Sequence, residues 1–376
     1  MTGNDEETPV SGADAPGSGE ETPASGGEAA PGEASGRSRR SRALSVLQWV
    51  LALGAFWYVA RDVDWAATAA DLASVPPAVV VAIAAVTTLE FGSRFSTWFV
   101  LLNGRVDTSL ATTARVDLVI KFINHVIPSK ASGHSVAPLV LGHYTDAEWT
   151  EAVSIAGLNT GLYATLYGVT ALAGVALFAA RLSRGWLVVI LLSTAVYLVA
   201  GALVVLAGRR MDVAGRVVGR LERLLARVPR VGDRLAGVAG AVPSFTDESA
   251  GVFRELSARP LVVGLYALGW AGTLMVFPGL RVWLLLTALG GSLTPAVLLP
   301  VVLVMAYSVT VLPLTPGGVG VAEASATAVF VSLGVAPELA AVVVLVDRTL
   351  GVYLPAVLGW VPMARLDLSE LLARDV

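Results

Sequence analysis

The chain has 376 residues, of which 55% are hydrophobic and only 15% charged, and its mean hydropathy is +0.71. This apolar content exceeds what a soluble core of that length needs, so the composition favours an integral membrane protein. The formal net charge is −3, and the absence of cysteine excludes disulfides, thiol nucleophiles and thiolate metal ligands.

The amino-terminal 36 residues hold eight acidic side chains and no lysine or arginine. They are rich in Gly, Ser, Pro and Ala and carry almost no large apolar side chain, which predicts a disordered tail over residues 1–42. The tail ends in the basic cluster RSRRSR at 37–42, directly before the first apolar run. Because positive charge beside a first helix marks the cytoplasmic side, we expect a cytoplasmic amino terminus.

Long apolar runs without strand-like alternation predict an all-α polytopic membrane protein. A helix needs about 20 mostly apolar residues to cross a bilayer. Two further apolar segments, 118–141 and 296–334, are interrupted by proline and glycine; we call them the first and second broken segments. The expected full transmembrane helices, about six, are 43–60, 76–101, 152–180, 185–207, 261–287 and 339–362.

The stretch 208–259 contains ten arginines against six acidic residues, which predicts a cytoplasmic, basic, amphipathic linker. It is interpreted either as a solvated connector or as a helix on the lipid surface. With the amino terminus and this linker on one side, the first broken segment enters from the cytoplasm and the second from outside. Two re-entrant helices in an inverted repeat follow from this count, within a membrane domain over 43–365 and before a short cytoplasmic tail at 366–376.

The two broken segments share a pattern: KFINHVIPSKASGHS and VTVLPLTPGGVGVAEA each place a glycine five residues after a proline. Backbone groups freed at such breaks must face protein or a wet cavity, where N–H groups suit an anionic headgroup. The alternative is that proline and glycine merely kink ordinary spans. The candidate cavity residues are Asn124, Pro128, Lys130, Gly133 and His134 in the first segment and Pro313, Thr315, Pro316, Gly317, Gly318, Gly320 and Glu323 in the second.

Several ionisable side chains fall in or beside the apolar runs, where a lone charge is costly. Lys130 is a candidate phosphate contact, or a lysine that reaches the interface. Glu90 and Arg94 stand four residues apart on one helical face and are expected to pair. Asp347 and Arg348 point in different directions as neighbours and are expected to meet partners on other helices. Structural ion pairing is the alternative to a site role for these residues.

No motif of a known catalytic or cofactor site occurs in the sequence, so we expect neither an enzyme nor a cofactor. Only three histidines are present, at 125, 134 and 143, without a metal-binding pattern, and no metal site is expected. The partners that we expect are membrane lipids with phosphate headgroups rather than nucleic acid. A second copy of the chain or another membrane protein is a further partner compatible with the sequence.

The string Leu312–Ala324 resembles the signature of the flippase-like family named after the lysylphosphatidylglycerol synthase transmembrane region, which also occurs in archaeal membrane proteins. The first broken segment is similar to the family's amino-terminal motif, although this chain has His134 and Ala137 where the family usually has Glu and Arg. Arg348, with Pro355 and Gly359 after it, resembles the family's final span. The resemblance covers about residues 43–365.

The resemblance implies a plasma-membrane protein that binds phospholipids, or polyprenyl-phosphate-linked lipids, and moves them between leaflets. We expect no soluble aminoacyl-transferase domain after residue 365, and hence no lipid aminoacylation by this chain alone. Two alternatives stay open. One is a membrane subunit of a lipid-modifying or glycosyltransferase system, and the other is a small-solute transporter.

Overall fold

Helices make up the regular secondary structure of this chain in the parts that its computed structural model describes, residues 31–61, 63–126, 136–209, 247–312 and 314–364. The chain divides into two units, Met1–Leu44 and Ser45–Val376. In the first unit only the helical backbone from Pro31 is described. Everything below concerns the second unit.

The elements follow one another as α-helices with short 3₁₀ or π turns, named η, between them. In chain order they are α1 (Pro31–Ala60), α2 (Trp65–Ser74), α3 (Pro77–Asn103), α4 (Leu110–Val126), α5 (Ala137–Tyr144), α6 (Trp149–Phe178), η2 (Ala179–Arg181), α7 (Arg184–Arg209), α10 (Asp247–Ser257), α11 (Pro260–Ala271), η3 (Gly272–Val276), α12 (Phe277–Ala288), η4 (Ala296–Leu298), α13 (Leu299–Tyr307), η5 (Ser308–Val311), η6 (Pro316–Gly318), α14 (Val321–Ser332), α15 (Pro337–Arg348), η7 (Thr349–Tyr353), α16 (Leu354–Leu358) and α17 (Trp360–Met363).

The helix starts are encoded locally. Proline opens α3, α11 and α15, where its missing N–H would have had no helical partner. Asp64 caps α2 by accepting from the amides of Ala66 and Ala67 at 3.0 Å. At the start of α6 the side chains of Glu148 and Glu151 form a reciprocal capping box.

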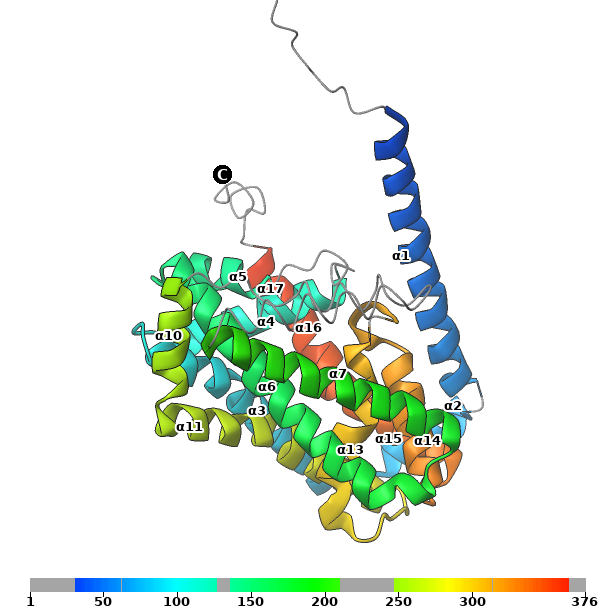
Figure 1. The fold of residues 1–376 in the computed structure, drawn as a ribbon. Coiled ribbons are helices and arrows are strands. Elements are labelled where there is room, and N and C mark those ends of the chain that lie inside the picture. Colours follow the sequence, from blue (N-terminus) through cyan, green and yellow to red (C-terminus); the bar gives the residue numbers. More distant parts are fainter. Residues whose placement is uncertain (1–30, 62, 127–135, 210–246, 313, 365–376) are drawn as a thin grey trace, which may run out of the picture. The chain divides into compact units, whose positions relative to one another are not determined.

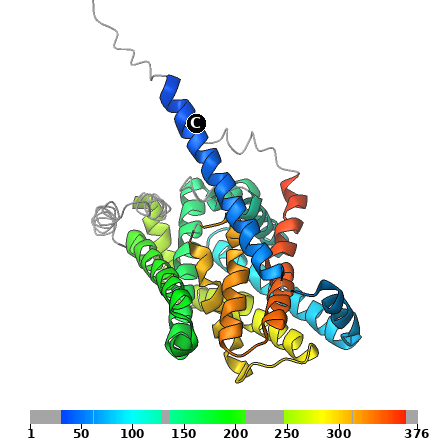
Figure 2. The same ribbon diagram turned by 90° about the vertical axis from the view of Figure 1, so that its right-hand side faces the viewer.

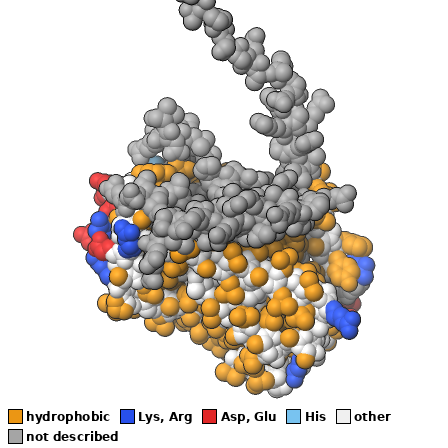
Figure 3. Space-filling view, in the orientation of Figure 1, with side chains coloured by type: hydrophobic (Ala, Val, Ile, Leu, Met, Phe, Trp, Pro, Cys, Tyr) orange, Lys and Arg blue, Asp and Glu red, His pale blue; other side chains and the backbone are white. Residues whose placement is uncertain are grey.

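Five helical stretches are long and apolar enough to cross a membrane: Pro77–Asn103, Trp149–Arg181, Arg184–Gly208, Pro260–Ala288 and Pro337–Met363. They match five of the predicted spans. The remaining one, 43–60, coincides with the end of α1, of which Val46–Ala60 is a shorter apolar helix. Exposed Val, Leu and Trp side chains are frequent on these helices, and hydrophobic side chains cover much of the face seen in Figure 3. The chain is therefore an all-helical, multi-pass membrane protein.

The α6–α7 hairpin is the most extensively packed helix pair among the described residues, and the two green helices run side by side in Figure 1. Small residues permit this approach: a Cβ built on Gly201 would lie 2.6 Å from Oγ1 of Thr165, and one on Gly168 would lie 2.8 Å from Cδ2 of Leu198. On the other side of the bundle, α3 packs against α11 and α12, and α14 packs against α15. Figure 2 shows α14 and α15, in orange, between the α6–α7 hairpin and α3.

Both broken segments are interrupted helices in the structure. The first consists of α4 and α5 on either side of residues 127–135, which lie outside the described part of the chain. The second consists of α13 and η5, then the irregular stretch around η6, then α14. The turn η6 packs against α4, so the two breaks meet. Entry from opposite faces and an inverted repeat stay predictions.

The final part of the predicted linker is helix α10, and its apolar residues are buried rather than solvated. Phe253 and Leu256 are fully buried, and α10 packs against α6, α7 and α11. A Cβ on Gly208 would overlap the Phe253 ring, so the absence of a side chain near the end of α7 allows α10 to pack there. Residues 210–246, which include the predicted amphipathic face, lie outside the described residues.

Two spans that the sequence predicted as plain helices contain a π turn. One is η3, between α11 and α12, and the other is η7, between α15 and α16. A proline follows each turn at the same spacing, Pro278 after η3 and Pro355 after η7. Because proline cannot donate to the preceding turn, the wider π turn accommodates it, and such turns often occur at functional sites.

Candidate functional site

A cavity of about 580 Å³ opens among α3, α4, α5, α6, α7, α11, α12, α13, α15 and the turns η3, η5, η6 and η7. Its volume falls within the range of about 300 to 1,000 Å³ that is usual for small-molecule sites. Helices from the whole length of the second unit contribute to it. The wall combines charged, aromatic and amide side chains, which is unusual within an apolar helical bundle.

Arg281 on α12 is the centre of a buried ion network, with only 1% of its surface exposed. It donates to Glu90 Oε2 on α3, and its Nε and Nη2 both donate to Asp347 Oδ1 on α15, at 2.9 and 2.6 Å. Tyr307 on α13 donates to the other Asp347 oxygen at 2.9 Å. Four helices are thus tied by groups that would be costly to bury singly.

A second ion pair joins the second broken segment to the last span. Arg348 Nε donates to Oε1 of the fully buried Glu323 at 2.8 Å, and the Tyr353 hydroxyl donates to the same oxygen at 2.6 Å. Glu323 Oε2 accepts from the amide of Gly320 at 2.6 Å and so closes the start of α14. Position 320 requires glycine, because φ is +80° and a Cβ would overlap the Ala52 carbonyl oxygen of α1.

Arg94 and Arg348 keep part of their hydrogen-bonding capacity unused. Arg94 Nη2 donates to Glu90 Oε1 at 3.0 Å and to the Gly351 carbonyl at 2.7 Å. Its Nε and Nη1 are buried without a hydrogen-bond partner among the described residues, and the same holds for Arg348 Nη2. Both arginines line the cavity, which therefore has cationic N–H donors available to a ligand.

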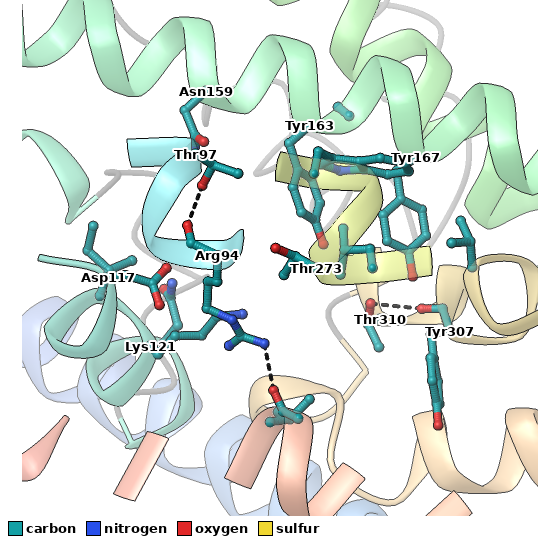
Figure 4. A pocket seen from close by; sticks show the side chains of 18 of the residues that line it. Arg94, Thr97, Asp117, Lys121, Asn159, Tyr163, Tyr167, Thr273, Tyr307 and Thr310 are labelled. Carbon is teal, nitrogen blue, oxygen red and sulfur yellow. Dashed lines mark hydrogen bonds between the residues drawn. The ribbon is translucent and has the colours of Figure 1, made fainter. Parts of the chain in front are cut away.

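Helix α4 brings a third cation and a carboxylate to the cavity wall. Asp117 and Lys121 stand one turn apart and lie beside Arg94, as Figure 4 shows. Asp117 is 5% exposed, and its Oδ2 has no hydrogen-bond partner in the described part of the chain. On the other side of the cavity stand Tyr163 and Tyr167, and Tyr167 stacks on Tyr197 with ring centroids 4.4 Å apart.

The predicted site residues fall into three groups. Asn124, Gly317, Arg348, Glu90, Arg94 and Asp347 line the cavity. Thr315, Pro316, Gly318, Gly320 and Glu323 are not among the lining residues and lie from the residue before η6 to the first turn of α14. Pro128, Lys130, Gly133, His134 and Pro313 lie outside the described residues.

The two breaks meet at Gly317, whose φ is +60°. A Cβ there would lie 2.6 Å from Cδ2 of His125, so only glycine permits this approach between η6 and α4. The contact brings one predicted residue from the second broken segment against the end of α4, in the first. His125 and Gly317, which are 192 positions apart in the chain, thus form one wall.

Sequence reasoning missed Arg281, Asp117, Lys121 and the tyrosines as site residues. Arg281 lies in the predicted span 261–287, and a charge inside a span is a signal of function that the sequence did contain. Asp117 and Lys121 are four residues apart near an apolar run, which is the same signal that marked Glu90 and Arg94. The tyrosines carry no such signal, because aromatic side chains are ordinary components of a membrane helix. Among the described residues, no group of His, Asp and Glu side chains could hold a metal ion.

A family model described as "Lysylphosphatidylglycerol synthase TM region" matches residues 45–359, which is most of the chain and the whole cavity. No curated protein and no solved structure matches the sequence.

Proposed function

Because this chain belongs to the lysylphosphatidylglycerol synthase transmembrane-region family, we propose that it binds a phosphate-bearing lipid in its cavity and moves it between leaflets. The lipid is a phospholipid or a polyprenyl-phosphate-linked lipid of the plasma membrane. Both chain termini lie in the cytoplasm. The proposal assigns no enzymatic step to the chain.

The observation that carries the proposal is the set of buried N–H donors of Arg94 and Arg348 that lack a partner among the described residues. A buried donor without an acceptor costs about 1 to 3 kcal/mol, and more when it is charged. Phosphate oxygens are strong acceptors that suit guanidinium groups, and each new charge-assisted bond would relieve that cost. The ammonium of Lys121 adds a third positive charge to the same wall.

A fixed polar site inside the bundle also addresses the physical obstacle to lipid movement. A phosphate headgroup must leave water to cross the hydrocarbon region, where an unpaired charge is strongly disfavoured. The cavity replaces part of its hydration with preoriented donors. Helix α4 and turn η6 meet at His125 and Gly317, where the two broken segments touch. When the protein opens alternately to the two sides of the membrane, this contact is the one that separates.

The proposal is tested by reconstituting the full chain into phosphatidylcholine liposomes that contain an acyl-labelled fluorescent phospholipid. A membrane-impermeant reductant quenches the label in the outer leaflet, and lipid movement makes the inner-leaflet label accessible as well. We expect Lys121→Gln to slow this movement about tenfold, since a charge-assisted hydrogen bond contributes about 1.5 to 3 kcal/mol. Arg115→Gln is the matched control, because Arg115 is an exposed cation on the same helix.

The assay is repeated with each phosphate-bearing lipid and with a proton or sodium gradient imposed in either direction. The proposal is refuted if quenching equals that of protein-free liposomes under all of these conditions. Equal effects of Lys121→Gln and Arg115→Gln would argue against the cavity as the route.

A further inference from the structure

We propose that one proton enters the cavity with each anionic lipid and is carried across the membrane on the carboxylate of Asp117. The proton comes from water, forms an O–H bond at Oδ2 of Asp117, and returns to water on the opposite side. The inference rests on the proposed function and deepens it by naming the ion gradient that drives the lipid. Asp117 is then the residue that couples the two movements.

The ionisable side chains around the cavity balance one another in charge. Among the described residues, four cations and four carboxylates line the cavity or form an ion pair with a residue that does. They are Arg94, Lys121, Arg281 and Arg348, and Glu90, Asp117, Glu323 and Asp347. A phosphodiester therefore adds one uncompensated negative charge to the interior of the bundle, where such a charge is strongly disfavoured. Uptake of one proton restores the balance.

Asp117 is the carboxylate of this set that can accept a proton without losing a contact. Glu90, Glu323 and Asp347 each have both oxygens occupied by donors from described residues. Asp117 is 5% exposed, and its Oδ2 has no hydrogen-bond partner in the described part of the chain. Protonation turns this oxygen into a donor, and a phosphate oxygen is a strong acceptor for it.

The elements packed against α4 bring few other titratable groups to Asp117. They are α3, α5, α16, α17 and η6. Helix α3 contributes Glu90 and Arg94, which form an ion pair at 3.0 Å. The titratable residues of α5, His143 and Tyr144, do not line the cavity, and α16, α17 and η6 contain none. The acceptor is therefore not supplied by these neighbours.

Helix α4 itself carries Arg115, which is exposed, and two titratable residues that line the cavity, Lys121 and His125. The positive charge of Lys121 is already part of the balance. His125 donates from Nδ1 to the Lys121 carbonyl oxygen at 2.8 Å, and its other ring nitrogen is the alternative site for the proton. Protonation of Asp117 removes its repulsion of the phosphate, whereas protonation of His125 leaves that repulsion in place. The charges thus favour Asp117.

Proton coupling determines which force moves the lipid. The proton cancels the charge that the lipid adds, so a complete cycle moves no net charge across the membrane. The lipid then follows a pH gradient and does not respond to the membrane potential. Without the proton, each cycle moves one negative charge and the opposite holds. For one charge, a tenfold ratio between leaflets corresponds to one pH unit in the first case and to about 59 mV in the second.

The test separates these two forces in phosphatidylcholine liposomes that contain the full chain. A trace of acyl-labelled phosphatidylglycerol, whose phosphodiester carries its only charge, is allowed to equilibrate, and albumin then extracts the label from the outer leaflet. A gradient of one pH unit is compared with a potassium diffusion potential of about 59 mV at equal pH. We expect the pH gradient to enrich the label about tenfold in the leaflet on the alkaline side, and the potential to leave it evenly distributed. An even distribution under the pH gradient, with enrichment under the potential, would overturn the proposal.

The variants assign the proton to Asp117. Asp117→Asn resembles the protonated form but cannot exchange the proton, so its label should ignore the pH gradient and follow the potential about tenfold. Asp117→Glu should keep the response to pH, and Asp71→Asn, at an exposed acid of α2, should behave as the unsubstituted chain. A pH response that persists in Asp117→Asn and disappears in His125→Gln would overturn the assignment in favour of His125.

Proton uptake in detergent tests the same assignment without lipid movement. The purified full chain, in weakly buffered neutral detergent with a pH indicator, should take up about one proton for each phosphatidylglycerol bound, and its affinity should fall as pH rises. Asp117→Asn should bind the lipid without proton uptake. If this variant keeps its helix content by circular dichroism but binds no phosphatidylglycerol, the view that binding requires an uncharged residue 117 is wrong.

These results also separate the inference from the proposed function. Protein-dependent movement of the label that follows the potential and not the pH gradient would refute the proton and leave phosphate-lipid movement intact. Movement no faster than in protein-free liposomes would refute both.

Discussion

Substitution of Arg281 by methionine is the most direct test of the buried network. Methionine preserves much of the side-chain length but removes the donors that Arg281 gives to Glu90 and Asp347. Glu90 keeps its hydrogen bond from Arg94, whereas Asp347 keeps only that from the Tyr307 hydroxyl. One carboxylate is therefore left buried with a single neutral donor.

Removing one partner of a buried ion pair typically costs about 3 to 5 kcal/mol, chiefly because the remaining charge stays uncompensated. Because Glu90 retains Arg94, only the Asp347 carboxylate loses its charged partner. We therefore expect Arg281→Met to lower the free energy of unfolding by about 3 to 5 kcal/mol. The added substitution Asp347→Asn removes the orphaned charge and should recover about 2 kcal/mol or more. Arg259→Gln is the control, because its ion pair with Glu255 is about half exposed and such pairs contribute about 0 to 1 kcal/mol.

The free energy of unfolding is measured by titrating the detergent-solubilised full chain with a denaturing detergent and following helix content by circular dichroism. If Arg281→Met lies within about 1 kcal/mol of the unsubstituted chain, the network does not hold the four helices together. A double variant less stable than Arg281→Met would contradict the view that the uncompensated carboxylate is the source of the loss.

Three further predictions concern packing and backbone geometry, and the same unfolding measurement checks each. Gly317→Ala should lower the free energy of unfolding by about 1 to 2 kcal/mol, because φ is +60° and the new Cβ meets His125. The loss should exceed that of Gly290→Ala, where φ is +76° but no atom lies within 4 Å of the new Cβ. A smaller loss for Gly317→Ala would contradict the contact between the two broken segments. Tyr353→Phe removes one hydrogen bond and should lower the free energy of unfolding by about 1 kcal/mol. Glu323→Gln should lower it several times as much, because the buried Arg348 then lacks its carboxylate partner. Equal losses would argue against a charge pair. Gly201→Val should lower the free energy of unfolding by about 1 to 3 kcal/mol, because the new side chain overpacks against Thr165. Gly264→Ala, whose Cβ meets no atom within 4 Å, should be neutral or slightly stabilising. An unchanged free energy of unfolding in Gly201→Val would show that α6 and α7 can separate.

Hydropathy alone located the spans closely. The structure begins and ends its five long apolar helices within a few residues of the predicted ones, because a bilayer-spanning helix satisfies its own backbone and needs only length and apolar side chains. The two breaks were equally local signals, since proline and glycine interrupt a helix wherever they stand. Their approach at Gly317 was not a local signal, and neither were the π turns η3 and η7.

The charges show where the sequence by itself stops. It marked Glu90, Arg94, Asp347 and Arg348 as side chains that need partners, and it identified one such pair, because four residues on a helix bring Glu90 and Arg94 to the same face. The partnership of Arg281 with Glu90 and Asp347, and of Arg348 with Glu323, depends on how each helix is rotated and where it crosses its neighbours. Only the tertiary structure decided that, and it alone left Asp117 facing the cavity with an acceptor that described residues do not fill.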